Sequence, residues 1–123
     1  MAYVLVFIGS GIGGVLRYAV GVMALRLWGA GFPFGTLAIN IIGSALMGLV
    51  AGLFAALGGG QDLRLFLTTG IIGGFTTFST FSLDVAALWE RQHYAAAVLY
   101  VVLSVGVSLA ALTSVLALAR RWI

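Results

Sequence analysis

Apolar side chains fill four long stretches of this sequence, and polar residues gather in the short connections between them. The stretches cover about 3–25, 35–57, 65–89 and 95–119. A helix needs about 20 apolar residues to cross the hydrocarbon core of a bilayer, so each stretch is long enough for one crossing. The pattern therefore predicts an all-α membrane protein, with one four-span domain over residues 1–123.

The third stretch contains the segment least suited to a continuous helix. Its centre, GIIGGFTTFSTFS over residues 70–82, mixes glycines, hydroxyl side chains and phenylalanines. Each glycine costs a helix about 1 kcal/mol relative to alanine, and threonine loses rotamer freedom there. We therefore expect this helix to break near the bilayer midplane, around Gly73 to Thr77. Broken backbone at that depth must be buried in protein or line an aqueous cavity, so the break predicts a binding or permeation site.

A broken helix exposes two kinds of backbone group. The first half ends in carbonyls without partners, which suit a cation, and the second half begins with free amides, which suit an anion. Phe78 and Phe81 lie three residues apart and share nearly one helix face. The positive edges of their rings can help a small anion to shed water. The alternative for this pair is packing against lipid or other helices.

Small residues recur every four positions along the first stretch. Gly9, Gly13, Arg17 and Gly21 share one helix face, and small residues at this spacing let two helices pack closely. Arg17 is costly at such depth and must face the bundle or reach an interface. Two roles fit it: attraction of an anion, or a structural bond to backbone carbonyls.

The second and fourth stretches also carry polar side chains at helical spacing. Asn40 has donors and an acceptor to satisfy, so it must face protein or water, either as a clamp between helices or as a donor to an anion. Tyr100, Ser104 and Ser108 follow one another at intervals of four. Their hydroxyls could bond to carbonyls of their own helix or form a polar track.

Composition supports the membrane assignment and excludes several functions. The chain is 63% hydrophobic and 7% charged, which leaves too little polar surface for a soluble globule. Its six arginines are spread along the chain and form no basic patch, so the net charge of +3 does not indicate nucleic-acid binding. With one histidine and no cysteine, we expect neither a hydrolytic metal site nor a nucleophilic enzyme. The start of the chain lacks the features of a cleaved signal, so we expect the first span to remain.

Arginines near the ends of the spans are almost evenly divided between the two sides of the membrane. Four crossings place Arg64, Arg120 and Arg121 on one side and Arg26 and Arg91 on the other. Orientation follows the basic residues of short loops, and this division gives almost no bias. The chain could therefore insert both ways, and an antiparallel homodimer would bring two broken helices together.

Three segments resemble the small dual-topology fluoride channels of the Fluc or CrcB family. They are GIGGVLRY around Arg17, GTLAIN ending at Asn40, and GGFTTFSTFS over residues 73–82, and they cover three of the four spans. The resemblance implies an antiparallel homodimer with two narrow pores in the cell inner (plasma) membrane. Such a channel passively exports fluoride from the cytoplasm and relieves fluoride toxicity.

The resemblance also implies roles for individual residues. Phe78 and Phe81 would be the pore phenylalanines and Asn40 the pore asparagine, with Arg17 in the vestibule. The polar track of the pore would be formed by Ser79, Thr80, Ser104 and Ser108.

The same resemblance implies a bound cation at the break. A sodium ion at the dimer centre would be held by the backbone carbonyls of Gly73 and Thr76. Its role would be structural, since fluoride is the transported ion. Sodium is the only cofactor that the resemblance implies.

Two other functions compete with the channel. Small multidrug antiporters also have four spans, but they need a membrane carboxylate in the first span, where this chain has only Arg17. A non-transporting membrane assembly protein would use the glycine faces purely for packing. In that case Phe78 and Asn40 should tolerate substitution wherever the dimer still forms.

Overall fold

The computed structural model describes residues 1–122, and the regular structure within them is helical. The elements are α1 (Ala2–Trp28), α2 (Phe34–Leu57), α3 (Gln61–Leu65), η1 (Phe66–Ile72), α4 (Gly73–Phe75), α5 (Ser79–Glu90) and α6 (Tyr94–Trp122). Four segments are long and apolar enough to cross a membrane: α1, α2, the run from α3 to α5, and α6. The predicted four-span, all-α class is therefore confirmed, with the third crossing beginning at Gln61 and the fourth continuing to Trp122.

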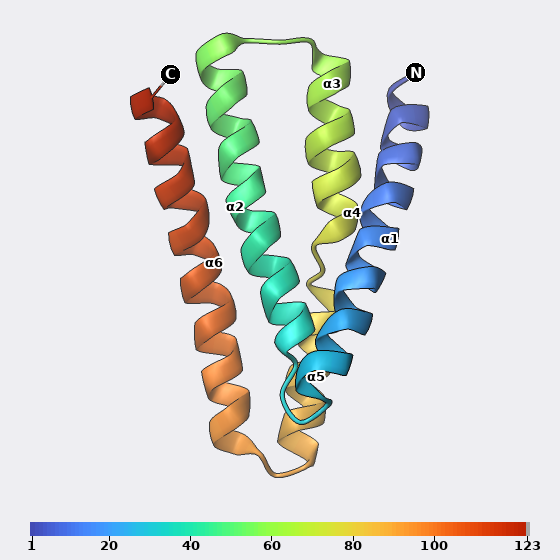
Figure 1. Ribbon diagram of the computed structural model, residues 1–123, viewed down its shortest axis with the longest axis vertical. Helices are drawn as coiled ribbons and strands as arrows, with labels where there is room; N and C mark the ends of the chain where they lie inside the picture. The colour runs from blue at the N-terminus through green and yellow to red at the C-terminus, as the bar shows by residue number, and fades with distance from the viewer. Residues whose placement is uncertain (123) are drawn as a thin grey trace.

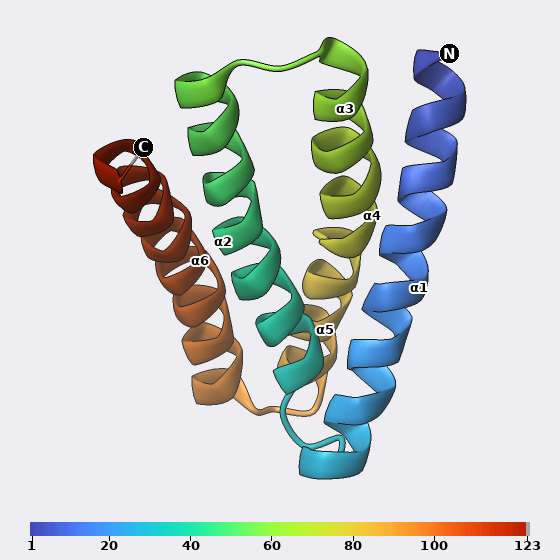
Figure 2. The ribbon, with the colours of Figure 1, turned by 45° about the horizontal axis from the view of Figure 1, so that its top comes forward.

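The four crossings alternate in direction, so both termini and the α2–α3 connection lie at one end of the molecule (Figure 1). Helix α6 packs along α2, while α1 packs against η1 and α4. These two groups diverge toward the end that carries the termini and converge toward α5, as the turned view in Figure 2 also shows. The third crossing thus stands between α1 and the α2–α6 pair.

The third crossing breaks where α4 ends. Its first half runs through η1, a π-helix, into α4, and the backbone becomes extended at Thr76 with φ −78° and ψ 159°. Helix α5 starts at Ser79, so the irregular segment covers 76–78 and lies at the C-terminal limit of the expected interval. Gly73 and Gly74 themselves remain helical. The run of hydroxyl residues, and not the glycines, therefore coincides with the break.

The glycines instead allow close contact between α1 and the third crossing. A methyl group on Gly9 would lie 2.8 Å from the Cα of Gly70, and one on Gly74 would lie 2.6 Å from the carbonyl oxygen of Ser10. A methyl group on Gly13 would overlap the carbonyl oxygen of Ile71. This contact confirms the predicted packing face at Gly9 and Gly13, because only residues without a Cβ permit such an approach.

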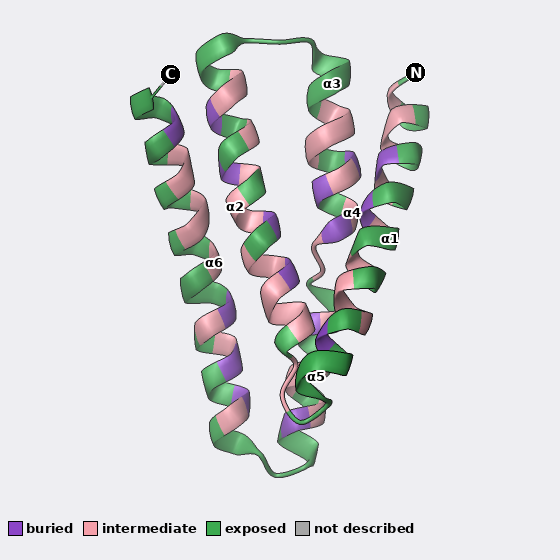
Figure 3. Cartoon of the chain, viewed as in Figure 1, coloured by how far each residue is buried: buried purple, intermediate pink, exposed green. Residues whose placement is uncertain are grey.

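Burial in the single chain is confined to the inward faces of the helices (Figure 3). Between 11% and 22% of the residues in the most apolar window of each crossing are buried, so most apolar side chains face outward. The largest buried side chains are Tyr100 and Leu88, which pack with Phe81 and Ala97 where α5 meets α6. An apolar exterior is the surface expected of helices surrounded by lipid.

Candidate functional site

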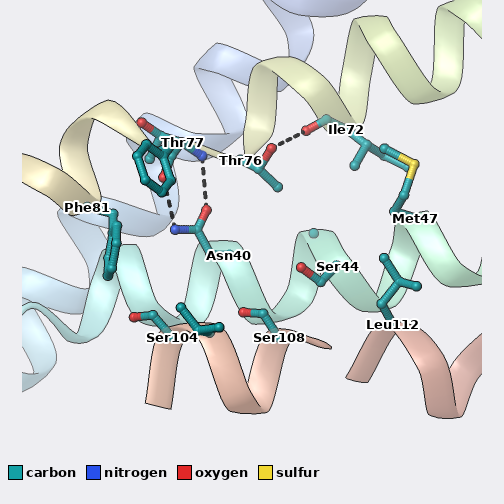
Figure 4. A pocket seen from close by; sticks show the side chains of 13 residues that line it. Asn40, Ser44, Met47, Ile72, Thr76, Thr77, Phe81, Ser104, Ser108 and Leu112 are labelled. Carbon is teal, nitrogen blue, oxygen red and sulfur yellow. Dashed lines mark hydrogen bonds between the residues drawn. The ribbon is translucent and has the colours of Figure 1, made fainter. Parts of the chain in front are cut away.

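A cavity of about 300 Å³ lies beside the break, between α2, α6 and the third crossing (Figure 4). Five of the residues predicted for the pore line it together: Asn40, Phe78, Phe81, Ser104 and Ser108. Thr76 and Thr77 of the break complete its polar wall. The described residues that line this cavity include no charged side chain. It is therefore an uncharged chamber whose polar groups are amides and hydroxyls.

A second cavity of about 420 Å³ lies on the other side of the break. It is lined by Arg17 and Tyr18 from α1 and by Thr80 and Asp84 from α5. Thr77 borders both cavities. The resemblance placed Thr80 in one polar track with Ser104 and Ser108. In the structure Thr80 instead lines the second cavity, together with Arg17.

Ser79 and Gly73 line neither of these cavities. Ser79 is exposed, and its Oγ lies 3.3 Å from the Oγ1 of Thr77. Gly73 is also exposed in the single chain. Ser79 is the first residue of α5 and does not share the cavity that Ser104 and Ser108 line.

Asn40 is hydrogen-bonded to the backbone of the break. Its Nδ2 donates to the carbonyl oxygen of Thr77 at 2.9 Å, and its Oδ1 accepts from the Thr77 amide at 2.9 Å. The side chain therefore clamps two helices, one of the two roles that the sequence left open. Its role as a donor to an anion stays a prediction.

Arg17 is also bonded to the third crossing. Its Nε donates to the carbonyl oxygen of Gly74 at 3.2 Å, which is the carbonyl-held arrangement considered for this residue. The guanidinium group has five N–H donors, so this bond leaves others free. Since Arg17 also lines the second cavity, the contact is compatible with the predicted vestibule role, which stays a prediction.

Several of the backbone groups freed by the break thus find side-chain partners. The amide of Thr80 donates to the Oγ1 of Thr77 at 3.2 Å and so begins α5. The carbonyls of Gly73 and Thr76 differ, because no donor within residues 1–122 is hydrogen-bonded to either. These two oxygens remain acceptors at the end of α4, where the helix dipole is negative.

The two phenylalanines predicted for the pore have different surroundings. Their ring centroids are 5.5 Å apart, and the planes are inclined by 51°. Phe81 is 9% exposed and packs against Tyr100, whereas Phe78 is 77% exposed. Phe81 therefore belongs to the core of the chain as well as to the cavity, while the ring of Phe78 projects from the chain.

Two of the three serines of α6, Ser104 and Ser108, have buried hydroxyls for which the described residues provide no partner. The Oγ atoms of Ser104 and Ser108 are inaccessible, and neither has a hydrogen-bond partner in the described part of the chain. Thr113 in the same helix shows the alternative, because its Oγ1 donates to the Leu109 carbonyl oxygen at 2.8 Å. Buried hydroxyls are nearly always paired, so two buried hydroxyls with no partner among the described residues indicate a place for a ligand or water beside this cavity.

Comparison with known proteins assigns the chain to a family. The model of the family described as CrcB-like protein, Camphor Resistance (CrcB) matches residues 4–116. The chain belongs to the CrcB family. Its relatives include a fluoride-specific ion channel FluC of Methylobacterium nodulans, which is 55% identical over 95% of this chain and 94% of the relative.

Two further CrcB relatives are similar over almost the whole length. The fluoride-specific ion channel FluC of Rhodopseudomonas palustris is 50% identical over 98% of each chain. The fluoride-specific ion channel FluC 2 of Nitrobacter hamburgensis is 49% identical, again over 98% of each chain. The similarity therefore includes all four crossings.

Sequence reasoning missed one polar contact of this CrcB chain. The hydroxyl of Tyr100 donates to Oδ2 of Asp84 at 3.0 Å, across the α5–α6 pair. The sequence pattern places Tyr100 in a polar stripe and gives no sign of Asp84 as its partner. A phenol in an otherwise apolar helix needs a partner when buried, and that requirement is the signal that could have joined the two.

Proposed function

We propose that the chain is a passive, fluoride-selective ion channel of the cell inner membrane. It exports fluoride from the cytoplasm and acts as an antiparallel homodimer with two pores. The names of the CrcB relatives support the choice of ion. The observation that carries the proposal is the cavity beside the break, which is lined both by two phenylalanines and by two serines whose buried hydroxyls have no partner among the described residues.

The chemistry of the cavity suits a small anion that must lose water. Hydroxyl and amide N–H groups can replace water as donors, and aromatic edges add weak positive potential. Conduction needs binding that is strong enough for entry and weak enough for release. An uncharged lining meets this requirement better than an arginine would. It also offers no carboxylate for proton-coupled exchange, which disfavours an antiporter.

A second copy of the chain would complete the site. Phe78 is 77% exposed in the single chain, although its neighbours form the cavity wall. The balanced arginines allow insertion in both orientations, and an antiparallel partner would then cover this ring. Two copies related by a twofold axis would contain two equivalent pores.

A structural sodium ion fits the carbonyls at the end of α4. Those of Gly73 and Thr76 have no donor among the described residues, and oxygen atoms are the ligands that a hard cation prefers. We propose that two chains would together hold one sodium ion through these oxygens. When bound, the ion would offset the negative ends of two broken helices at the dimer centre.

Fluoride efflux from liposomes tests the channel. Purified protein should release fluoride rapidly and retain chloride without any imposed pH gradient. Phe78→Ile should slow fluoride efflux by at least about tenfold, equivalent to about 1.4 kcal/mol on the barrier. Phe7→Ile is the matched control. Phe7 is 79% exposed on α1, and it lines a different hollow from the one beside the break. Wild-type protein that releases no fluoride would contradict the proposal.

Exchange of sodium tests the cation site separately. Replacing sodium with N-methylglucamine should lower the thermal stability of the purified dimer and abolish efflux, because the carbonyl oxygens of Gly73 and Thr76 would no longer bind a cation. Restoring sodium should reverse both changes. Equal stability and equal efflux in the two salts would exclude the ion while leaving the channel proposal intact.

A further inference from the structure

The side chain of Asn40 replaces the hydrogen bonds that the break removes. At an unbroken position, the amide and carbonyl of Thr77 would bond within the helix. Because the backbone is extended at Thr76, both groups turn outside the helix, and each bonds to Asn40 at 2.9 Å. Figure 4 shows the two parallel bonds between this side chain on α2 and the break.

The pair of bonds also fixes the orientation of the amide of Asn40. A carboxamide has two N–H donors and one oxygen acceptor, and the contact uses the oxygen and one N–H. Turning the amide by half a rotation would place donor against donor and acceptor against acceptor at Thr77. The bonds therefore hold Asn40 in one orientation and leave a single N–H for the cavity that it lines.

The constraint continues from Thr77 into α5. Its Oγ1 accepts from the Thr80 amide at 3.2 Å, so the first turn of α5 is built on the residue that Asn40 holds. Phe78 follows Thr77 directly and is the N-cap residue of this helix. On the opposite side of the break, Arg17 holds the Gly74 carbonyl at 3.2 Å. The irregular segment is thus attached to α2, and α4, which precedes it, is attached to α1.

We infer that Asn40 is a positioning residue: it fixes the Thr77 peptide group and thereby sets the direction of α5 and the place of the Phe78 ring. This inference rests on the proposed channel function and deepens it. It assigns the main effect of Asn40 to the backbone of the break, in addition to any contact of its remaining N–H with the anion. The group that donates to Asn40 is the backbone amide of Thr77, and a side-chain substitution does not remove a backbone N–H.

A backbone ester at position 77 tests the inference directly. The α-hydroxy analogue of threonine, introduced by nonsense suppression, removes the Thr77 N–H and keeps its side chain. It also makes the Thr76 carbonyl a weaker acceptor, so efflux is compared at a sodium concentration that saturates both proteins. The ester and Asn40→Ala should each slow fluoride efflux by about tenfold, the effect expected for a lost hydrogen bond. Together they should slow it no further than Asn40→Ala alone, because both break the same contact.

The same ester chemistry at Thr113 is the matched control. Thr113 lies in α6, and its side chain bonds within its own helix. An ester there removes one helical amide away from the break and should leave efflux unchanged. Two outcomes would overturn the inference: an ester at position 77 that conducts like wild type, or effects of the ester and Asn40→Ala that multiply.

A pH profile of Asn40→Asp provides a readout that general loss of stability would not change. A neutral aspartic acid has one O–H donor and one acceptor, so it can form both bonds to Thr77 with no donor left for the cavity. The ionised form has two acceptors and must repel the Thr77 carbonyl. The membrane interior disfavours the charged form, so efflux relative to wild type should rise by about tenfold from mildly alkaline to mildly acidic pH. Asn40→Asp that is equally slow throughout would assign the residue to direct anion contact.

Other titratable groups, which wild type and Asn40→Asp share, also contribute to the pH dependence of efflux. The titratable side chains near the break are Arg17 and Tyr18 on α1, Asp84 on α5 and Tyr100 on α6. Division by the wild-type rate removes their contribution, and protein-free liposomes give the leak of neutral hydrogen fluoride. If wild type itself fails to conduct, the channel proposal fails. If wild type conducts and the ester and pH results are negative, only the positioning role fails.

Discussion

Tyr100 donates a hydrogen bond of 3.0 Å to Asp84, although the tyrosine side chain is completely buried. The ring of Tyr100 also packs against Phe81 at 5.2 Å and edge-on against Phe32 at 5.6 Å. The phenol thus joins α5, which carries Phe81, to α6 and to the α1–α2 connection. Asp84 in turn borders the second cavity together with Arg17. One polar contact therefore connects the core of the chain to the wall of that cavity.

Tyr100→Phe should lower the stability of the protein while preserving its packing. A hydrogen bond to a charged group contributes about 1.5–3 kcal/mol, and the substitution keeps the ring in place. The thermal unfolding midpoint in detergent should fall, and Tyr18→Phe is the control because Tyr18 is 75% exposed. A Tyr100→Phe protein as stable as wild type would mean that the carboxylate finds another partner.

Gly13→Ala should destabilise the protein and Gly14→Ala should not, although the residues are adjacent in α1. A methyl group on Gly13 would overlap the Ile71 carbonyl oxygen and lie 2.7 Å from the Phe75 amide nitrogen, whereas one on Gly14 would meet nothing within 4 Å. Forcing the two helices apart should cost about 1–3 kcal/mol. Alanine at position 14 should be neutral or stabilising by up to about 1 kcal/mol.

Thermal unfolding and the yield of folded protein measure both glycine variants. Gly13→Ala should unfold at a lower temperature and with lower yield, because α1 can no longer approach the third crossing. Equal loss in the two variants would show that the contact of α1 with the third crossing does not determine their stability.

Features imposed by the bilayer could be predicted from the sequence. The length of the apolar stretches gives four crossings, since a helix must span a fixed thickness. Repeated glycines indicate close packing, and the structure confirms this at Gly9 and Gly13. The break was predictable because glycine and hydroxyl residues are concentrated in one span.

Features that depend on distant contacts could not be predicted in the same way. The glycines Gly73 and Gly74 were assigned to the break, but contact with Ser10 on α1 keeps Gly74 in a tightly packed helix. The bonds of Asn40 to Thr77 join residues 37 positions apart, and nothing local specifies that pairing. Phe78 and Phe81 differ in exposure for a related reason: only Phe81 meets the core at Tyr100.

Ser104→Ala should separate stability from transport. The Oγ of Ser104 is buried with no partner among the described residues, so removing it leaves no other group unsatisfied. The unfolding midpoint should stay equal or rise, while fluoride efflux should fall by about tenfold if the hydroxyl replaces water around the anion. Thr113→Ala is the control for transport, because its hydroxyl bonds within α6. Unchanged efflux in Ser104→Ala would remove this hydroxyl from the proposed pore.

Two oppositely biased variants test the antiparallel pairing. Gly60→Arg with Gln61→Arg adds positive charge at the end that carries the termini, and Ala30→Arg with His93→Arg adds it at the other end. Each pair of substitutions should fix one orientation in the membrane, because basic residues of short loops remain in the cytoplasm. Either variant expressed alone should therefore give no fluoride efflux, and expressing both together should restore it.

The exposed ring of Phe78 explains why both biased variants should be needed for efflux. A chain held in one orientation can meet only parallel copies of itself, which cannot supply the twofold-related surface that would cover the ring and complete the cavity. Only a chain inserted the other way can do so. Full efflux from one biased variant alone, with its orientation verified by labelling of a cysteine introduced at a terminus, would contradict the antiparallel dimer. The cavity of a single chain would then have to conduct by itself.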